Sequence, residues 1–206
     1  MKPILLFLVI LGWFALTAQF YLIIENRVTS IPETICRYFT FFTILTNLLV
    51  AVSFSSILII SKSASDNFFS RPKVLTAITV YITIVGIVYN VILRFLWKPD
   101  GLQFIVDEIL HTIIPVLSIV FWFLYVSKSN LKWKDAFPWL IYPLVYIIVV
   151  LFRGDISGFY PYPFIDVGKI GYNKVLFNSG ILTLSFLLVS FLFILIGKKT
   201  KISNKM

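Results

Sequence analysis

The sequence is poor in the residues that most metal and redox sites need. It has one cysteine, Cys36, and one histidine, His111, among 206 residues. A single cysteine excludes a disulfide within the chain. A single histidine excludes bis-histidine haem ligation and a multi-histidine metal site within the chain. The sequence also lacks a phosphate-binding loop, a Gly-x-Ser-x-Gly elbow and a His-Glu-x-x-His zinc motif. We therefore expect neither a metal ion nor a cofactor.

Charged residues are also scarce. They make up 13% of the chain, whereas 59% is hydrophobic and the mean hydropathy is +0.96. This composition excludes a soluble domain and predicts an integral membrane protein. The charges cluster and leave charge-free runs, each close to the ~20 residues that a membrane-spanning helix needs. We expect one all-α domain, residues 1–206, with six transmembrane helices built on the runs 3–24, 38–61, 74–93, 109–127, 136–152 and 175–197.

The distribution of lysine and arginine predicts that both termini face the cytoplasm. In that orientation 11 of the 18 basic residues lie inside, and seven of the nine acidic residues lie outside. The first run is too long for the apolar core of a signal peptide and lacks a clear cleavage site, so we interpret it as a retained helix. A net charge of +9 suggests nucleic acid in a soluble protein. Here we expect no nucleic-acid partner, because the lysines set topology and contact the headgroups of the lipid bilayer.

His111 is the residue on which a functional interpretation depends. It lies inside an apolar run, three residues past the last charge, Glu108. An ionisable group in hydrocarbon is costly, so it often marks a functional site. Pro115 follows four residues later, removes the helix bond to the carbonyl of residue 111 and predicts a kink beside the imidazole. Asp107 precedes His111 by four and shares its face of the helix. The simpler alternative is a histidine that only bonds a neighbouring helix.

Hydroxyl groups are predicted at the same depth as the histidine. We expect a helix that opens at Cys36 and places Thr40, Thr43 and Asn47 on one face. Threonines in membrane helices often bond only their own carbonyls or a neighbouring helix. Thr40 and His111, however, each lie three residues beyond the last outer charge of their run, and therefore at similar depth. A hydroxyl beside a neutral histidine, with a carboxylate behind it, is the arrangement used for acyl transfer.

Further polar groups are predicted on the same side of the membrane. Asn90 and Arg94 share one face near the outer end of the third run, and the long outer loop 153–174 is rich in aromatic residues. Loops held over a scaffold commonly carry function. Arg94 either snorkels to the interface or holds a substrate carboxylate, and two asparagines are candidate oxyanion donors. The expected substrate-binding residues are Thr43, Asn47, Asn90, Arg94, Tyr160 and Tyr162.

Three short motifs occur in a recognisable order. They are Tyr38-Phe39-Thr40-Phe41, His111-Thr112-Ile113-Ile114-Pro115 and Tyr160-Pro161-Tyr162-Pro163-Phe164. In this order they resemble the androgen-induced protein family of multispan membrane hydrolases, and more closely its small bacterial relatives. The resemblance covers most of the chain. It implies Thr40 as the nucleophile and His111 as the base. It also implies hydrolysis of fatty acid esters of hydroxy fatty acids, the reaction of the eukaryotic branch, and a bacterial cell membrane as the location.

The expected function is hydrolysis of a lipid ester drawn from the outer leaflet. Thr40 would attack the ester carbonyl, His111 would move the proton, and Asp107 would orient the imidazole. The alternative is a non-catalytic lipid-binding protein or small-molecule transporter whose polar cluster lines a passage. Transporters usually show matched repeats and broken helices, and this chain shows no internal repeat. A third alternative is a membrane scaffold subunit whose polar stripe serves helix packing.

Overall fold

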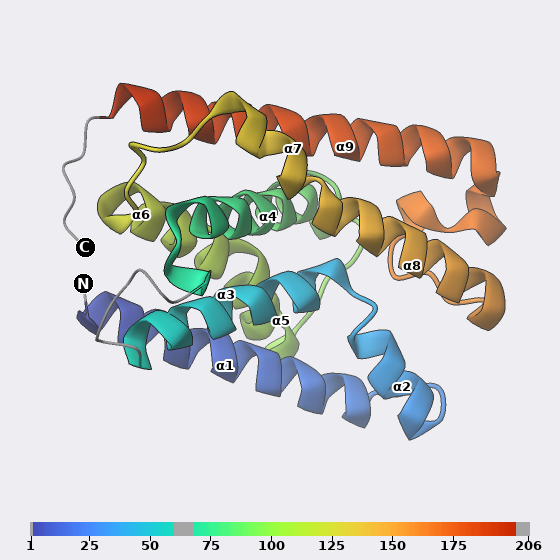
Figure 1. Cartoon of the computed structure of the whole chain (residues 1–206). Helices are drawn as coiled ribbons and strands as arrows, with labels where there is room; N and C mark the ends of the chain where they lie inside the picture. The colour runs from blue at the N-terminus through green and yellow to red at the C-terminus, as the bar shows by residue number, and fades with distance from the viewer. Residues whose placement is uncertain (1, 60–67, 201–206) are drawn as a thin grey trace.

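Six long helices form a bundle in the computed structural model, which describes residues 2–59 and 68–200 (Figure 1). All six are long and apolar enough to cross a membrane, and the described residues form no strand, so the predicted all-α membrane fold is confirmed. The spans are α1 (Lys2–Glu25), α3 (Phe42–Ile59), α4 (Pro72–Val91) with η2 (Leu93–Phe95), α5 (Gly101–Glu108) with η3 (Ile109–Ile113) and α6 (Ile114–Tyr125), η4 (Trp133–Asp135) with α7 (Ala136–Trp139) and α8 (Ile141–Ser157), and α9 (Val167–Lys199). Two short elements, α2 (Ile31–Tyr38) and η5 (Pro163–Ile165), lie between spans, and η1 (Phe68–Ser70) precedes α4.

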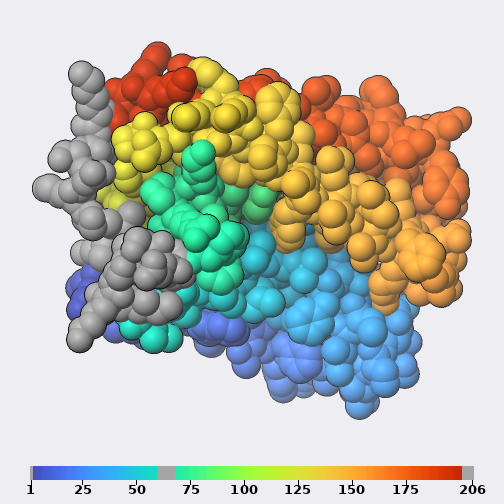
Figure 2. All heavy atoms as spheres, in the orientation of Figure 1, coloured from blue at the N-terminus to red at the C-terminus, as the bar shows by residue number. Residues whose placement is uncertain are grey.

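Helix α4 is the central element. Of its span 67% is buried, against 22% for the span that contains α8. Figure 1 shows α4 between α9 on one side and α1 on the other. The first residue of α1 and the last of α9 lie at the same end of the bundle, as six crossings require. Side chains of α8 form much of the surface in Figure 2, and the exposed ones between Ile141 and Phe152 are apolar, as contact with lipid requires.

Small residues bring the helix backbones close together. A Cβ atom at Gly12 of α1 would lie 3.4 Å from the Cβ of Ala51 of α3. A Cβ atom at Gly86 of α4 would lie 3.0 Å from the Cβ of Pro115 of α6. Lipid tails are as apolar as the helix surfaces, so helices in a membrane associate largely through this kind of close packing. The second contact fixes α4 against the helix that carries the histidine.

The second helix does not open at Cys36, as the sequence predicted. Helix α2 ends at Tyr38, residues 39–41 are not helical, and α3 begins at Phe42. The carbonyl of Thr40 accepts a hydrogen bond from the Tyr146 hydroxyl of α8 at 2.9 Å. In a continuous helix it would accept from the amide of Ile44. Thr40 therefore lies in a break between two helices and does not share a helix face with Thr43 and Asn47.

The first turn of α2 is held by two arginines. Glu33 accepts hydrogen bonds from Arg37 at 2.9 Å and from Arg153 of α8 at 2.7 Å. These arginines, the hydrogen bond from Arg37 above all, hold the pKa of the Glu33 carboxyl below its ordinary value. The Tyr38 hydroxyl donates to the Leu16 carbonyl of α1 at 2.8 Å, and burial raises its pKa to about 12. Helix α2 is thus tied to both α1 and α8.

The predicted outer loop 153–174 is shorter in the structure. Helix α8 continues past Arg153 to Ser157 and ends at Gly158, whose φ of 68° is the left-handed conformation that favours glycine at a helix end. Helix α9 begins at Val167, where the Asp166 side chain accepts from the Lys169 amide at 3.2 Å. The connection is therefore 158–166, and the helical path is interrupted once more at Gly171, whose φ is 74° and ψ 159°. Residues 62–67 of the predicted cytoplasmic loop and residues 201–206 of the basic tail lie outside the described residues.

The orientation predicted from the basic residues can be tested by cysteine labelling. Ser129 and Ser157 are exposed and lie at opposite ends of the span Trp133–Ser157. In a Cys36→Ser background, a membrane-impermeant maleimide added to intact cells should label the Ser157→Cys variant and leave the Ser129→Cys variant unlabelled. The reason is that lysines concentrate beside Ser129. Labelling of Ser129→Cys alone would show that the protein has the opposite orientation to the one predicted.

Candidate active site

A large cavity opens at the end of the bundle that carries α2 and η5. Its space is about 1730 Å³ when the open side is counted. It is lined from α1, α2, α3, α4, the turn after η2, α5, η3 and the connection before η5. Its polar lining residues include Gln19, Tyr38, Thr43, Tyr89, Trp97, Lys98, Asp100, Gln103, Asp107, His111 and Tyr162.

His111 is held in one tautomer. Its Nδ1 lies 2.9 Å from the backbone oxygen of Asp107 and 3.7 Å from a carboxylate oxygen of the same residue. Both neighbours are oxygens that accept, so Nδ1 carries the proton and Nε2 keeps its lone pair. The ring stacks on Tyr89 of α4 with centroids 4.0 Å apart. Among the described residues, none bonds Nε2, which leaves this nitrogen able to accept a proton from a ligand or nucleophile.

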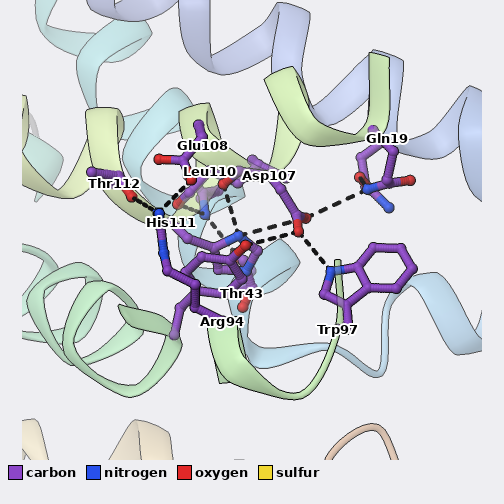
Figure 3. Close-up of polar contacts among 12 residues, drawn as sticks. Gln19, Thr43, Arg94, Trp97, Asp107, Glu108, Leu110, His111 and Thr112 are labelled. Carbon is purple, nitrogen blue, oxygen red and sulfur yellow. Dashed lines mark hydrogen bonds and ion pairs between the residues drawn. The ribbon is translucent and has the colours of Figure 1, made fainter. Parts of the chain in front are cut away.

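The Asp107 carboxylate is buried and surrounded by donors. It accepts from the Tyr89 hydroxyl at 3.0 Å and from the Gln103 amide at 3.4 Å. It also accepts from the Trp97 indole at 2.9 Å (Figure 3). Gln103 also donates to Gln19 of α1 at 2.9 Å. These bonds offset the cost of burying a charge. Sequence reasoning predicted Asp107 but missed its partners. The spacing of four between Gln103 and Asp107 on one helix face was the available signal.

The predicted kink at Pro115 takes the form of a π-helix, η3, whose closing bond runs from the Ile114 amide to the Ile109 carbonyl. This shift and the missing N–H of Pro115 leave the carbonyls of residues 110 and 111 without their usual helical donors. Two asparagines supply donors instead. Asn47 of α3 bonds the Leu110 carbonyl at 3.2 Å, and Asn90 of α4 bonds the His111 carbonyl at 3.3 Å.

Asn47 and Asn90 were predicted as substrate-binding residues, and the structure shows them bonded to backbone. The Asn47 amide also bonds the Thr43 carbonyl at 2.9 Å, so one nitrogen bridges the threonine backbone and the residue next to His111. Asn90 also contacts the Thr112 hydroxyl at 3.4 Å. Neither asparagine lines the cavity. Both side chains therefore position the backbone on either side of the histidine.

The three threonines of this region lie in different places. The Thr40 hydroxyl donates to the Cys36 carbonyl at 2.7 Å, and the Thr46 hydroxyl pairs with Tyr142 at 3.2 Å. Neither lines the cavity. Thr43 lies in the first turn of α3 and lines the cavity together with His111. The structure therefore brings Thr43, and not Thr40, to the space that the histidine faces.

Tyr162 reaches Thr43 from the connection before η5. Its hydroxyl accepts from the Thr43 amide at 3.2 Å and lies 3.4 Å from the Thr43 hydroxyl. The Thr43 amide is one of the first N–H groups of α3, which have no partner within the helix. Burial raises the pKa of Tyr162, so its hydroxyl stays protonated and can donate. Tyr160, also predicted to bind substrate, packs instead on Gly154 of α8.

Arg94 is not directed into the cavity. It forms an ion pair with Glu108 and donates to the Thr112 hydroxyl at 3.2 Å. Arg94 is absent from the cavity lining, whereas Lys98 is one of the lining residues. The sequence predicted Arg94 on the same side of the membrane as His111 and did not predict its pairing with Glu108. The arginine predicted to hold a substrate carboxylate already holds a protein carboxylate.

Comparisons with known proteins leave the geometry as the main evidence for function. The chain matches no family model, no curated protein and no solved structure. Among the described residues, no group of three His, Cys, Asp or Glu side chains is placed to hold a metal ion. The side chains that the cavity does bring together are a hydroxyl, an imidazole with a free nitrogen and a buried carboxylate.

The bridging role of Asn47 predicts a loss of stability on substitution. Asn47→Leu removes the donor to the Leu110 carbonyl, which then lies unpaired in an apolar interior. We expect a loss of about 1–3 kcal/mol in the free energy of unfolding, measured by denaturation in detergent micelles. Ser185→Ala is the matched control, because the exposed Ser185 hydroxyl bonds only its own helix. Equal stability of Asn47→Leu and the parent would show that the Leu110 carbonyl does not need this donor.

Proposed function

We propose that the protein is a membrane-embedded carboxylic ester hydrolase that acts on a lipid, with Thr43 as the nucleophile and His111 as the base. The observation that carries the proposal is that Thr43 and the unbonded Nε2 of His111 share one cavity. The motifs that resemble the androgen-induced protein family support the same chemistry, with the nucleophile moved from Thr40 to Thr43. The bacterial cell membrane is the location that this resemblance suggests.

The reaction would proceed in two steps. The Thr43 hydroxyl attacks the ester carbonyl, and His111 Nε2 takes its proton. The tetrahedral intermediate collapses as the imidazolium returns the proton to the leaving alcohol, which leaves an acyl group on Thr43. A water molecule, deprotonated by His111, then attacks the acyl carbonyl. The acid departs, and the proton returns to the Thr43 oxygen, which restores both side chains.

Two features would stabilise charge during these steps. The Tyr162 hydroxyl lies 3.4 Å from the Thr43 hydroxyl and would provide a donor for a developing oxyanion. The Asp107 carboxylate, 3.7 Å from Nδ1, stabilises the imidazolium that forms. Asp107 does not need to orient the ring, because its backbone oxygen already accepts from Nδ1 at 2.9 Å.

A set of threonine variants distinguishes the two candidate nucleophiles. With a fatty acyl p-nitrophenyl ester as substrate, Thr43→Ala should lose activity by orders of magnitude and Thr43→Ser should retain turnover. Thr40→Ala should remain active, with a stability loss of about 1 kcal/mol from the missing bond to Cys36. Initial rates at equal amounts of folded protein provide the measurement.

Two outcomes would change the proposal. An inactive Thr40→Ala beside an active Thr43→Ala would return the nucleophile to Thr40 and leave the hydrolase in place. If the parent binds lipid esters and cleaves none, the lipid-binding or transport alternative replaces the hydrolase. The size and open side of the cavity suit that alternative.

Asp107→Asn tests whether the backbone oxygen or the carboxylate of Asp107 sets the tautomer of His111. In serine proteases the same substitution costs ~10⁴-fold in kcat because the imidazole adopts the wrong tautomer. Here the backbone oxygen of residue 107 still accepts from Nδ1, so we expect a clearly smaller loss in kcat. His111→Ala is the control for complete loss. A loss in Asp107→Asn as large as that in His111→Ala would mean that the carboxylate, and not the backbone, sets the tautomer.

A further inference from the structure

A second, apolar hollow lies on the other side of Thr43 and Tyr162. It is enclosed by α3, α4, α8, η5 and α9, and about 660 Å³ lies between its lining atoms when every gap between them and the open side are counted. Thr43, Leu93 and Tyr162 line both this hollow and the large cavity. The proposed nucleophile therefore stands where two differently lined spaces meet.

The hydroxyl groups along the hollow are bonded elsewhere, except at the end shared with the cavity. Ser179 donates to the Val175 carbonyl at 2.8 Å and Thr183 to the Ser179 carbonyl at 2.9 Å, both within α9. Tyr146 donates to the Thr40 carbonyl. These side chains present their carbon atoms to the hollow. Unlike them, Thr43 and Tyr162 keep their hydroxyl groups together, so these two hydroxyl groups are the polar part of a hollow that is otherwise lined by carbon.

The hollow extends along α9. The lining residues of this helix run from Ser179 to Phe186, a rise of roughly 10 Å at 1.5 Å per residue. The other lining side chains are mainly aliphatic or aromatic, from Ile84, Val85 and Val88 of α4 and Pro143 and Ile147 of α8. An apolar hollow with one pair of polar hydroxyl groups matches an acyl chain whose ester group lies at those hydroxyls.

We propose that this hollow is the acyl-chain subsite, that the large polar cavity receives the alcohol part of the ester, and that Thr183 helps to set the accepted chain length. This division rests on the proposed hydrolase function. It follows from the lining of the two spaces and from the position of Thr43 between them. It predicts a substrate with one acyl chain on the carbonyl side of the ester and a polar group on the alcohol side.

The test compares two substrates that differ only in the acyl chain, p-nitrophenyl butanoate and p-nitrophenyl hexadecanoate. Thr183→Leu and Thr183→Phe add carbon atoms inside the hollow. The ratio of kcat/KM for the hexadecanoate to that for the butanoate should fall about tenfold or more in Thr183→Phe and less in Thr183→Leu. The value for the butanoate should change much less, because a four-carbon chain fills less of the hollow than a sixteen-carbon chain.

Two controls separate the subsite from general damage. Leu184→Phe adds similar bulk at the next position of α9, where the side chain is 60% exposed on the outer surface, and should change neither rate. Thr183→Val removes the hydroxyl and keeps the volume, and should leave the ratio unchanged. Should Thr183→Phe fail to fold, Thr183→Leu carries the same test.

The outcomes distinguish this inference from the function on which it rests. An active parent whose chain-length ratio is unchanged in both Thr183→Leu and Thr183→Phe would overturn the subsite and leave the hydrolase. A parent that hydrolyses neither ester would overturn the hydrolase and the subsite together.

Discussion

The structure depends on which groups donate hydrogen bonds to the backbone carbonyls beside Pro115. A proline inside a membrane helix removes a donor where no water can replace it, and the π-helix at η3 shifts the bonds around the gap. Asn47 and Asn90 approach from two different helices and bond the two carbonyls left over. The close approach of Gly86 to Pro115 holds α4 at this point. Three helices are therefore fixed relative to one another within one turn of the histidine.

That rigid core determines the chemistry available at the cavity. His111 in η3 donates from Nδ1 to the carbonyl of Asp107. This leaves Nε2 without a hydrogen bond among the described residues. The buried carboxylate can remain in place because Tyr89, Trp97 and Gln103 donate to it from three separate positions in the chain. The Asn47 amide also bonds the Thr43 carbonyl, so it fixes the backbone of Thr43 relative to the histidine helix. Preorganised groups of this kind cost no rearrangement when charge develops.

Much of the fold could be predicted from the sequence because lipid allows few alternatives. Charge-free runs of sufficient length must become helices, and the spacing of Asp107 and His111 fixes their common face. The break at residues 39–41 could not be predicted, since it contains no glycine or proline and depends on a hydroxyl from Tyr146, about a hundred residues away. That break separates Thr40 from Thr43. Likewise, the sequence predicted only that Arg94 lies on the same side of the membrane as His111, because the pairing of Arg94 with Glu108 depends on how two helices pack.

The most direct test of the central claim is to identify the atom that reacts. The purified protein would be treated with a long-chain alkyl fluorophosphonate, digested, and mapped by tandem mass spectrometry. If Thr43 is the nucleophile activated by His111, the phosphonyl group should be found on Thr43 and should be missing from His111→Ala protein. An adduct on Thr40 or on any other residue, or an adduct that forms equally well without the histidine, would contradict the site described here.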